Sequence, residues 1–195
     1  QKVHAVVLSG GSAFGLESTC GVSKYLEENN IGFDVGVAKV PIVVGAVLFD
    51  LGVGNPKSRP NIEMGYRACQ VASDTKLNQG NFGAGCGATV GKIKGIEYAM
   101  KGGIGSHSIK LPNGLVVSAL VAVNAFGDVY ENGKVIAGVM DDEKKNVLNS
   151  YELMKNGVNK GGFSIDNTTI GIVATNAKLD KAGCKKVSQM AHNGY

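Results

Sequence analysis

Glycine is the residue type that most constrains this chain. The 195 residues include 29 glycines, about 15% against a usual ~7%, and only 4 prolines. The glycines lie between apolar segments and form no low-complexity tract. Because glycine adopts backbone angles that other residues avoid and lets two segments approach closely, this composition predicts many tight turns and close backbone contacts.

Apolar periodicity predicts an alternation of strands and helices. The expected strands are short apolar runs, at 3–8, 41–49, 115–123, 127–130, 134–139 and 168–175. The expected helices cover 16–28, a segment capped by Asn61, a piece around 147–154 that Gly157 ends, and a last segment opened by Asp180. Turn signals at 112–114 and 131–133 indicate hairpins. With no internal repeat and no linker, residues 1–195 are expected to form one mixed α/β domain.

Charge and hydropathy exclude two classes of partner. The net charge of +4 comes from 20 Lys and Arg against 16 Asp and Glu, without the basic cluster and interleaved aromatics of a nucleic-acid groove. No apolar run approaches the roughly 18 residues that a membrane-spanning helix needs. We therefore expect neither a nucleic-acid partner nor a membrane partner.

The cysteines and histidines predict no metal site. Cys20, Cys69, Cys86 and Cys184 match neither a zinc-ligand spacing nor a small disulfide scaffold, which favours a reducing, cytoplasmic setting. The three histidines are scattered along the chain, and His4, inside an apolar strand, is interpreted as a hydrogen-bonded structural residue.

The glycine-rich loops do not fit a nucleotide site. In the segment 85–92, Cys86 stands where the phosphate-loop pattern needs glycine, and Ile93 follows Lys92 where a hydroxyl residue is needed. The relaxed dinucleotide fingerprint at 83–88 is a match that a glycine-rich chain produces by chance. The loop 9–15, between a strand and a helix, either offers backbone amides to an anion or is a plain tight turn. No Gly-x-Ser-x-Gly elbow is present, which argues against a serine triad.

The segment 161–176 carries the strongest chemical signal, because a polar loop there runs into an apolar strand that opens with Thr168. A hydroxyl residue at such a junction can attack its own preceding carbonyl in an N-to-O acyl shift, and hydrolysis of the ester frees a new N-terminus. The released α-amine, with a pKa of about 7.7–8.0, can then act as general base for its own hydroxyl. The alternative is that Thr168 and Thr169 are ordinary β-branched residues at the start of a strand, and local composition alone favours it.

Six segments together resemble the DmpA-type L-aminopeptidase/D-esterase family, relatives of the nylon-oligomer hydrolases. They occur in family order from Gln1 to Tyr195, at 6–16, 40–43, 80–89, 101–105, 119–125 and 161–176. The resemblance implies a four-layer αββα sandwich with mixed sheets, like that of the ornithine acetyltransferases. It also implies autoproteolysis into two chains, with the cut between Asn167 and Thr168.

The resemblance also assigns roles to individual residues. Thr168 would be the nucleophile, Asn124 the oxyanion donor and Lys101 a polar or cationic neighbour of the reacting carbonyl. The alternatives are a turn residue after a strand for Asn124 and an exposed charge for Lys101. Phe49 stands where some members carry a tyrosine, so any role of that hydroxyl is absent here.

The expected function is that of a cofactor-free hydrolase, an aminopeptidase, amidase or esterase that releases N-terminal residues from short peptides, amides or esters. The resemblance implies a homo-oligomer, a tetramer of processed pairs, with a small peptide or amide as substrate. It also implies that the chain is truncated at both ends relative to the family, whose members contribute partners of the nucleophile from beyond Tyr195. Two alternatives stay open: an acyltransferase of the ornithine acetyltransferase kind, and a non-catalytic module that binds a small ligand.

Overall fold

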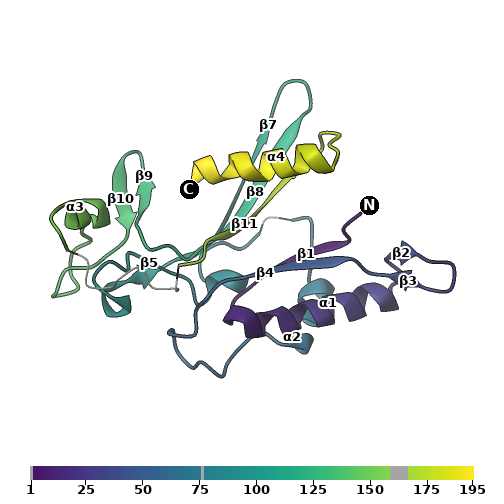
Figure 1. Cartoon of the computed structure of the whole chain (residues 1–195), viewed down its shortest axis with the longest axis horizontal. Helices are drawn as coiled ribbons and strands as arrows, with labels where there is room; N and C mark the ends of the chain where they lie inside the picture. Colours follow the sequence, from purple (N-terminus) through teal and green to yellow (C-terminus); the bar gives the residue numbers. More distant parts are fainter. Residues whose placement is uncertain (1, 76, 159–166) are drawn as a thin grey trace.

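The computed structural model describes residues 2–75, 77–158 and 167–195 as a mixed α/β arrangement of small sheets and helices (Figure 1). Its strands are β1 (Ala5–Ser9), β2 (Phe33–Asp34), β3 (Lys39–Val40), β4 (Val43–Val47), β5 (Thr89–Val90), β6 (Met100–Lys101), β7 (Gly103–Lys110), β8 (Val116–Val123), β9 (Val129–Glu131), β10 (Lys134–Ala137) and β11 (Ile170–Thr175). Its α-helices are α1 (Glu17–Glu28), α2 (Ile62–Gln70), α3 (Ser150–Lys155) and α4 (Lys181–Ala191). Short 3₁₀ helices occur at Ser12–Leu16, Gly83–Gly85, Ile96–Tyr98 and His192–Gly194.

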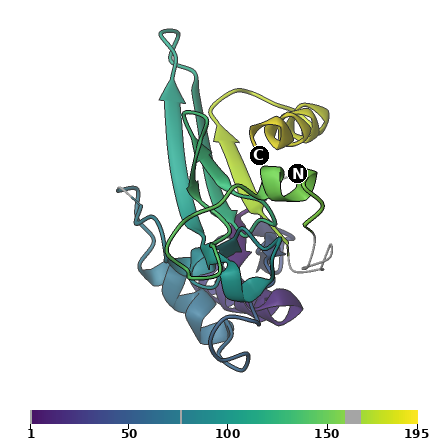
Figure 2. The same cartoon turned by 90° about the vertical axis from the view of Figure 1, so that its left-hand side faces the viewer.

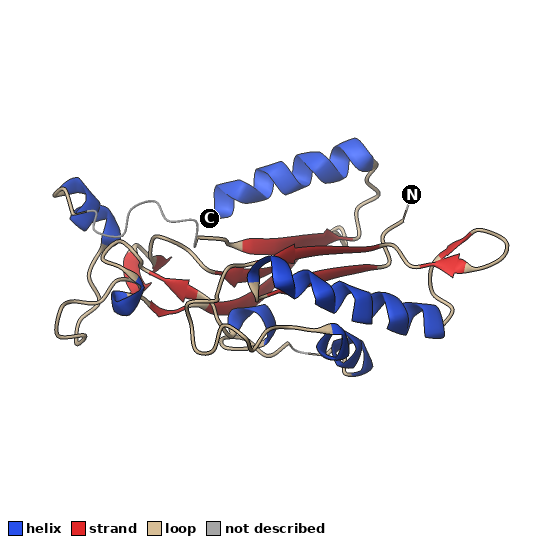
Figure 3. Ribbon diagram, turned by 60° about the horizontal axis from the view of Figure 1, so that its bottom comes forward, coloured by secondary structure: helices blue, strands red, loops and turns tan. Residues whose placement is uncertain are grey.

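Two sheets organise these elements. The antiparallel sheet has the order β11-β8-β7, and its β7–β8 hairpin extends well beyond the rest of the sheet (teal in Figure 2). The other is the parallel pair β1-β4, which runs in register from Ala5–Val43 to Ser9–Val47. Helix α4 lies on one side of the strands, whereas α1 and α2 lie on the opposite side (Figure 3).

The helix pair α1–α2 crosses at two glycines. A Cβ atom added at Gly21 would lie 1.9 Å from the carbonyl oxygen of Ile62, and one added at Gly65 would lie 2.0 Å from that of Ser18. Any larger residue at either position would force the helices apart. Next to this crossing the Tyr66 hydroxyl donates to the Glu28 carboxylate at 2.5 Å, and this hydrogen bond is the main cause of the raised pKa of Tyr66.

The core cluster lies where the two sheets meet. It contains the buried side chains of Leu48, Ala84, Ala88 and Ala122, against which Leu8, Ile104 and Ile170 pack. Three of the four buried members are alanines, so the backbones of β8, the segment after β4 and the loop 84–88 come close together. Polar residues follow three of the buried members within one or two positions, at Asp50, Thr89 and Asn124, so the cluster fixes the relative positions of these side chains.

Several predicted boundaries are confirmed. Asn61 caps α2 by accepting from the Met64 amide at 2.9 Å, and Asp180 caps α4 by accepting from the Gly183 amide at 2.7 Å. The β9–β10 hairpin turns at Asn132 and Gly133, whose φ angles are 50° and 77°. Such angles are typical of a two-residue Asn-Gly turn.

The structure differs from the sequence analysis in the start of one helix and in a long strand that was not expected. The helix expected around 147–154 starts only at Ser150, because the Asn149 side chain accepts from the Glu152 amide and places the N-cap there. Strand β7 was not predicted as a strand, because its first half is dense in glycine and its second half is polar except for Ile109. Pairing with β8 along eight positions, from Gly103–Val123 to Lys110–Val116, makes it a strand.

Candidate functional site

The ends of β8 and β11 bring two predicted site residues to the same edge of the sheet. Ile170 pairs with Ala122, so Thr168, two residues before Ile170, and Asn124, two residues after Ala122, leave the sheet at the same end (Figure 1). The backbone N–H of Asn124 donates to the Thr169 hydroxyl at 3.3 Å, which connects the two segments beyond the last paired residues of the sheet. Asn167 and Thr168 are described and half-buried, whereas 159–166, the loop expected to precede the cut, lie outside the described residues.

Asn124 is completely buried and hydrogen-bonded at both ends of its amide. Its Oδ1 accepts from the Thr89 amide at 3.1 Å and from the Lys92 ammonium at 2.9 Å. Its Nδ2 donates to the Phe49 carbonyl at 2.9 Å. Donors on the oxygen and an acceptor at the nitrogen fix the orientation of the amide. Asn124 is therefore a rigid buried group rather than a turn residue exposed to solvent.

Lys92 is a site residue that the sequence analysis missed. Only 7% of this residue is exposed, and its ammonium lies on Asn124. A buried ammonium is unfavourable unless it is hydrogen-bonded, and the Asn124 oxygen supplies one of its acceptors. The position of Lys92 within the segment 88–93, otherwise composed of small and apolar residues, is the signal that could have indicated burial.

Lys101 lies beside this network rather than on Asn124. It pairs with Thr89 across the β5–β6 ladder, and Thr89 in turn binds Asn124. The Lys101 side chain is exposed, and its ammonium donates to the Cys86 carbonyl. The structure thus places Lys92 on the buried side chain of Asn124, whereas Lys101 lies at the exposed surface beside the loop 84–88.

The two glycine-rich loops converge on Asp50. Asp50 Oδ1 accepts from the Gly11 amide at 2.7 Å, so the loop 9–15 bonds to the chain's own carboxylate. A Cβ atom added at Gly10 or at Gly87 would lie 2.3 or 2.1 Å from Asp50 Oδ2. A side chain at Gly87 would also meet the Asp50 Cβ at 2.5 Å, whereas one at Gly10 would displace the end of the Asp50 side chain. Asp50 therefore holds the two loops against the segment that carries the Phe49 carbonyl.

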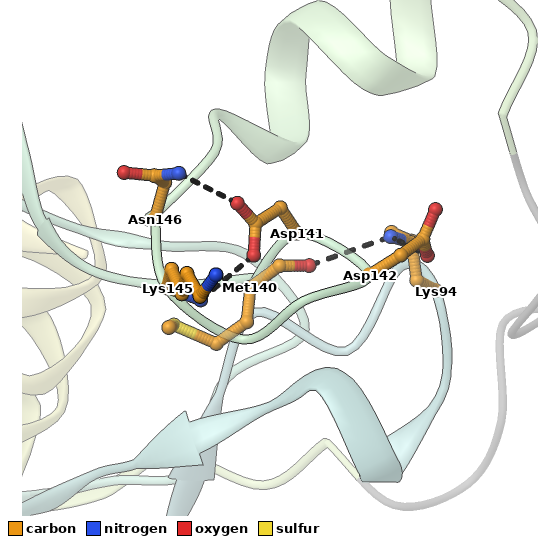
Figure 4. A network of polar contacts seen from close by, with 6 residues as sticks. All are labelled: Lys94, Met140, Asp141, Asp142, Lys145 and Asn146. Carbon is orange, nitrogen blue, oxygen red and sulfur yellow. Dashed lines mark hydrogen bonds and ion pairs between the residues drawn. The ribbon is translucent and has the colours of Figure 1, made fainter.

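A second polar network begins two residues after Lys92 (Figure 4). The Lys94 ammonium lies 2.6 Å from Asp142 Oδ1 and donates to the Met140 carbonyl at 3.5 Å. Asp141 accepts from the Lys145 amide at 2.8 Å and from Asn146 Nδ2 at 2.7 Å. The Lys145 bond is the largest cause of the lowered pKa of Asp141. The short segment with Lys92 and Lys94 therefore connects the buried amide to the turn that precedes α3.

His4 has a structural contact, and the cysteines form no disulfide in the described residues. The Nδ1 of His4 accepts from the Ile42 amide at 3.0 Å, which confirms His4 as a hydrogen-bonded structural residue. The four cysteines are free thiols, and burial raises the pKa of Cys69.

Within residues 2–75, 77–158 and 167–195, no three His, Cys, Asp or Glu side chains are grouped as metal ligands. In the same part of the chain, no helix has the length and apolar character needed to cross a membrane.

Comparison with known proteins identifies the family. The family model described as peptidase family S58 matches residues 1–195. The chain belongs to peptidase family S58. Among curated relatives, an uncharacterized aminopeptidase of Mycobacterium leprae is 41% identical over 202 residues, which cover 98% of this chain and 54% of the relative. A 6-aminohexanoate-oligomer endohydrolase of Kocuria is 26% identical over 199 residues, covering 97% and 54%. The chain thus spans about half the length of these relatives.

A solved structure also shares the fold. The crystal structure of a Pyrococcus horikoshii OT3 protein superposes with a TM-score of 0.55 over 90% of this chain and 43% of that protein, at 23% sequence identity. This likeness supports the arrangement of the elements and carries no information about the reaction.

Proposed function

We propose that this chain is the part of a self-processing hydrolase that carries the nucleophile Thr168 and the oxyanion donor Asn124. The observation that carries the proposal is the shared end of β8 and β11, where the Thr168 segment leaves the sheet beside a buried, orientationally fixed Asn124. The family membership and the aminopeptidase and endohydrolase names of the relatives support peptide or amide hydrolysis. The substrate class we propose is short peptides, amides or esters.

The proposed reaction has two stages. In maturation, the Thr168 hydroxyl attacks the Asn167 carbonyl, the C–N bond breaks as the nitrogen takes a proton, and water hydrolyses the resulting ester. This leaves a carboxylate on Asn167 and a free α-amine on Thr168. In turnover, that amine takes the hydroxyl proton while the oxygen attacks the substrate carbonyl, the amine product leaves with a proton, and water hydrolyses the acyl-enzyme. Both stages pass through a tetrahedral oxyanion.

The buried network suits oxyanion stabilisation. The Asn124 Nδ2 is a hydrogen-bond donor whose direction the Phe49 carbonyl helps to fix, and the proposal assigns this amide to the oxyanion. The Lys92 ammonium on Oδ1 withdraws electron density from the amide and brings positive charge near the developing anion. Preorganised donors of this kind act without reorganising during the reaction.

The finer family features remain proposals. We propose that the sheets described here are part of a four-layer αββα sandwich, since α4 and the α1–α2 pair lie on opposite sides of the strands (Figure 3). The homo-oligomer of processed pairs, the cytoplasmic setting and the absence of a cofactor stay predictions.

Mass spectrometry under denaturing conditions tests the proposal. The protein at its full natural length should yield one fragment that ends at Asn167 and one that begins with Thr168, and Thr168→Ala should stay uncut and inactive. An uncut parental protein that hydrolyses peptides, or a fully active Thr168→Ala variant, would overturn the assignment. Acyl transfer to an amino acid in preference to water would instead indicate the acyltransferase alternative.

A further inference from the structure

The ammonium of Lys101 holds one particular peptide group. It donates to the carbonyl oxygen of Cys86, from a lysine that the β5–β6 ladder places opposite Thr89. The Gly102 amide donates to the Ala88 carbonyl at 2.7 Å, which fixes the two segments beside each other one residue further along. The Cys86 carbonyl therefore faces Lys101.

The geometry of a trans peptide then orients the next amide. The carbonyl and the N–H of one planar peptide point in opposite directions, so the Gly87 N–H points away from Lys101. Its neighbours are all engaged: the amides of Gly85, Cys86 and Ala88 donate to carbonyls at 2.8, 3.1 and 3.3 Å. In the described parts of the chain (2–75, 77–158 and 167–195), no acceptor binds the Gly87 N–H. Gly87 is half-buried, so part of this residue is open to solvent.

The Gly87 amide also lies beside the buried network. The Gly87 α-carbon packs against Asp50. The residue before Asp50 is Phe49, whose carbonyl accepts from Asn124 Nδ2. Two residues after Gly87, Thr89 donates its amide to Asn124 Oδ1. Contacts on both flanks therefore tie this loop to Asn124.

We propose that the Gly87 N–H is a second donor to the oxyanion, and that Lys101 is the positioning residue that aims it. This rests on the proposed function of Thr168 and Asn124. Oxyanion sites work by directing preorganised donors at the charge that develops in the transition state, and backbone amides are common donors. The Lys101 ammonium also polarises the Cys86–Gly87 peptide, which strengthens its N–H as a donor.

The test uses Lys101 because it is exposed and its replacement leaves the core intact, whereas a Cβ at Gly87 would collide with Asp50. In matured full-length protein, Lys101→Met should lower kcat about 10–100-fold with little change in KM, less than the full loss of an oxyanion donor. Lys101→Arg, which can still donate to the carbonyl, should recover most of that loss. Lys110→Met, at the far end of β7, is the matched control and should keep the parental kcat.

A transition-state analogue separates this role from a structural one. A peptide aldehyde that adds reversibly to Thr168 forms the oxyanion, so its inhibition constant should rise in Lys101→Met by the same factor as kcat falls. A kcat within about twofold of the parental value, no recovery in Lys101→Arg, or an unchanged inhibition constant would overturn the proposal. Hydrolysis by Thr168→Ala would instead overturn the proposed function itself, so the two failures are distinguishable.

Discussion

The Lys92 ammonium lies 2.9 Å from the Oδ1 of Asn124, and both side chains are buried. This pair joins the segment after β5 to the end of β8, the same end at which the Thr168 segment enters the sheet. A charged donor on the amide oxygen both orients the amide and raises the positive potential where an oxyanion would form. Lys92 thus links the fold to the proposed chemistry.

We expect Lys92→Met to lower both catalysis and stability. Methionine fills the space of the lysine stem and the Asn124 oxygen keeps the Thr89 amide as a donor, so the loss of stability should be about 1.5–3 kcal/mol, the contribution of one hydrogen bond to a charged group. The kcat should fall about 10–100-fold because the amide loses its charged partner. Thermal unfolding and turnover of the matured protein check this, with the exposed Lys134→Met as control. Parental turnover in Lys92→Met would show that this ammonium has only a structural role.

Asn124→Asp separates the donor role of Asn124 from its structural role. The carboxylate can still accept from Lys92 and from the Thr89 amide, but it cannot donate to an oxyanion. We expect a folded protein whose kcat is roughly 10²–10³-fold lower, with a smaller change in KM. Asn124→Ala should show a similar kinetic loss and lower stability, since it leaves buried donors unsatisfied.

These Asn124 variants should also self-cleave slowly, because maturation passes through an oxyanion as well. The second chain is therefore produced separately with Thr168 already N-terminal, and circular dichroism checks the fold. If pre-matured Asn124→Asp hydrolyses an amino-acid p-nitroanilide at the parental rate, Asn124 is not the donor.

The two adjacent threonines should behave differently. Thr168→Ser should retain part of both cleavage and hydrolysis, because the reaction needs only a hydroxyl and an α-amine. Thr169→Ala should remain active and lose about 1–3 kcal/mol of stability, because the buried backbone N–H of Asn124 loses the hydroxyl that accepts from it. Intact mass and peptide hydrolysis measure both. An essential Thr169 with a dispensable Thr168 would place the cut one residue later.

The turn at Asp141 predicts a loss of stability in acid. Its carboxylate accepts from the Lys145 amide and from Asn146, and these bonds lower its pKa below the ordinary value of about 3.9. Because the folded pKa is the lower one, the stabilisation is fully present above the ordinary value and is lost as pH falls through the folded value. Asp141→Asn should therefore lose stability near neutral pH and show a shallower decline below about pH 4.

Urea unfolding between pH 3 and pH 7 measures this difference, with Asp74→Asn, at an exposed carboxylate, as the matched control. Parallel pH profiles for the parental protein and Asp141→Asn would contradict the assignment. The same variant should leave the kcat of matured protein unchanged, because Asp141 lies in the Lys94 network and has no contact with Asn124 among the described residues.

Local sequence determined most elements and their ends. Asn61 and Asp180 cap their helices as expected, because a capping side chain needs only the amides three residues on. The Asn132-Gly133 turn follows from backbone angles that few other residues adopt. The resemblance to a family assigned candidate roles to Thr168 and Asn124. Local composition alone favours an ordinary strand residue for Thr168 and a turn residue for Asn124.

The tertiary structure alone decided which lysine meets Asn124. Lys92 and Lys101 both follow glycine-rich or apolar segments, and nothing within either segment says which ammonium is buried. The outcome depends on the β5–β6 pairing, which turns Lys101 toward the Cys86 carbonyl, and on the close packing around Ala88 and Ala122, which brings Lys92 onto the amide. Burial of a charge depends on contacts between segments far apart in the chain, and no local pattern encodes those contacts.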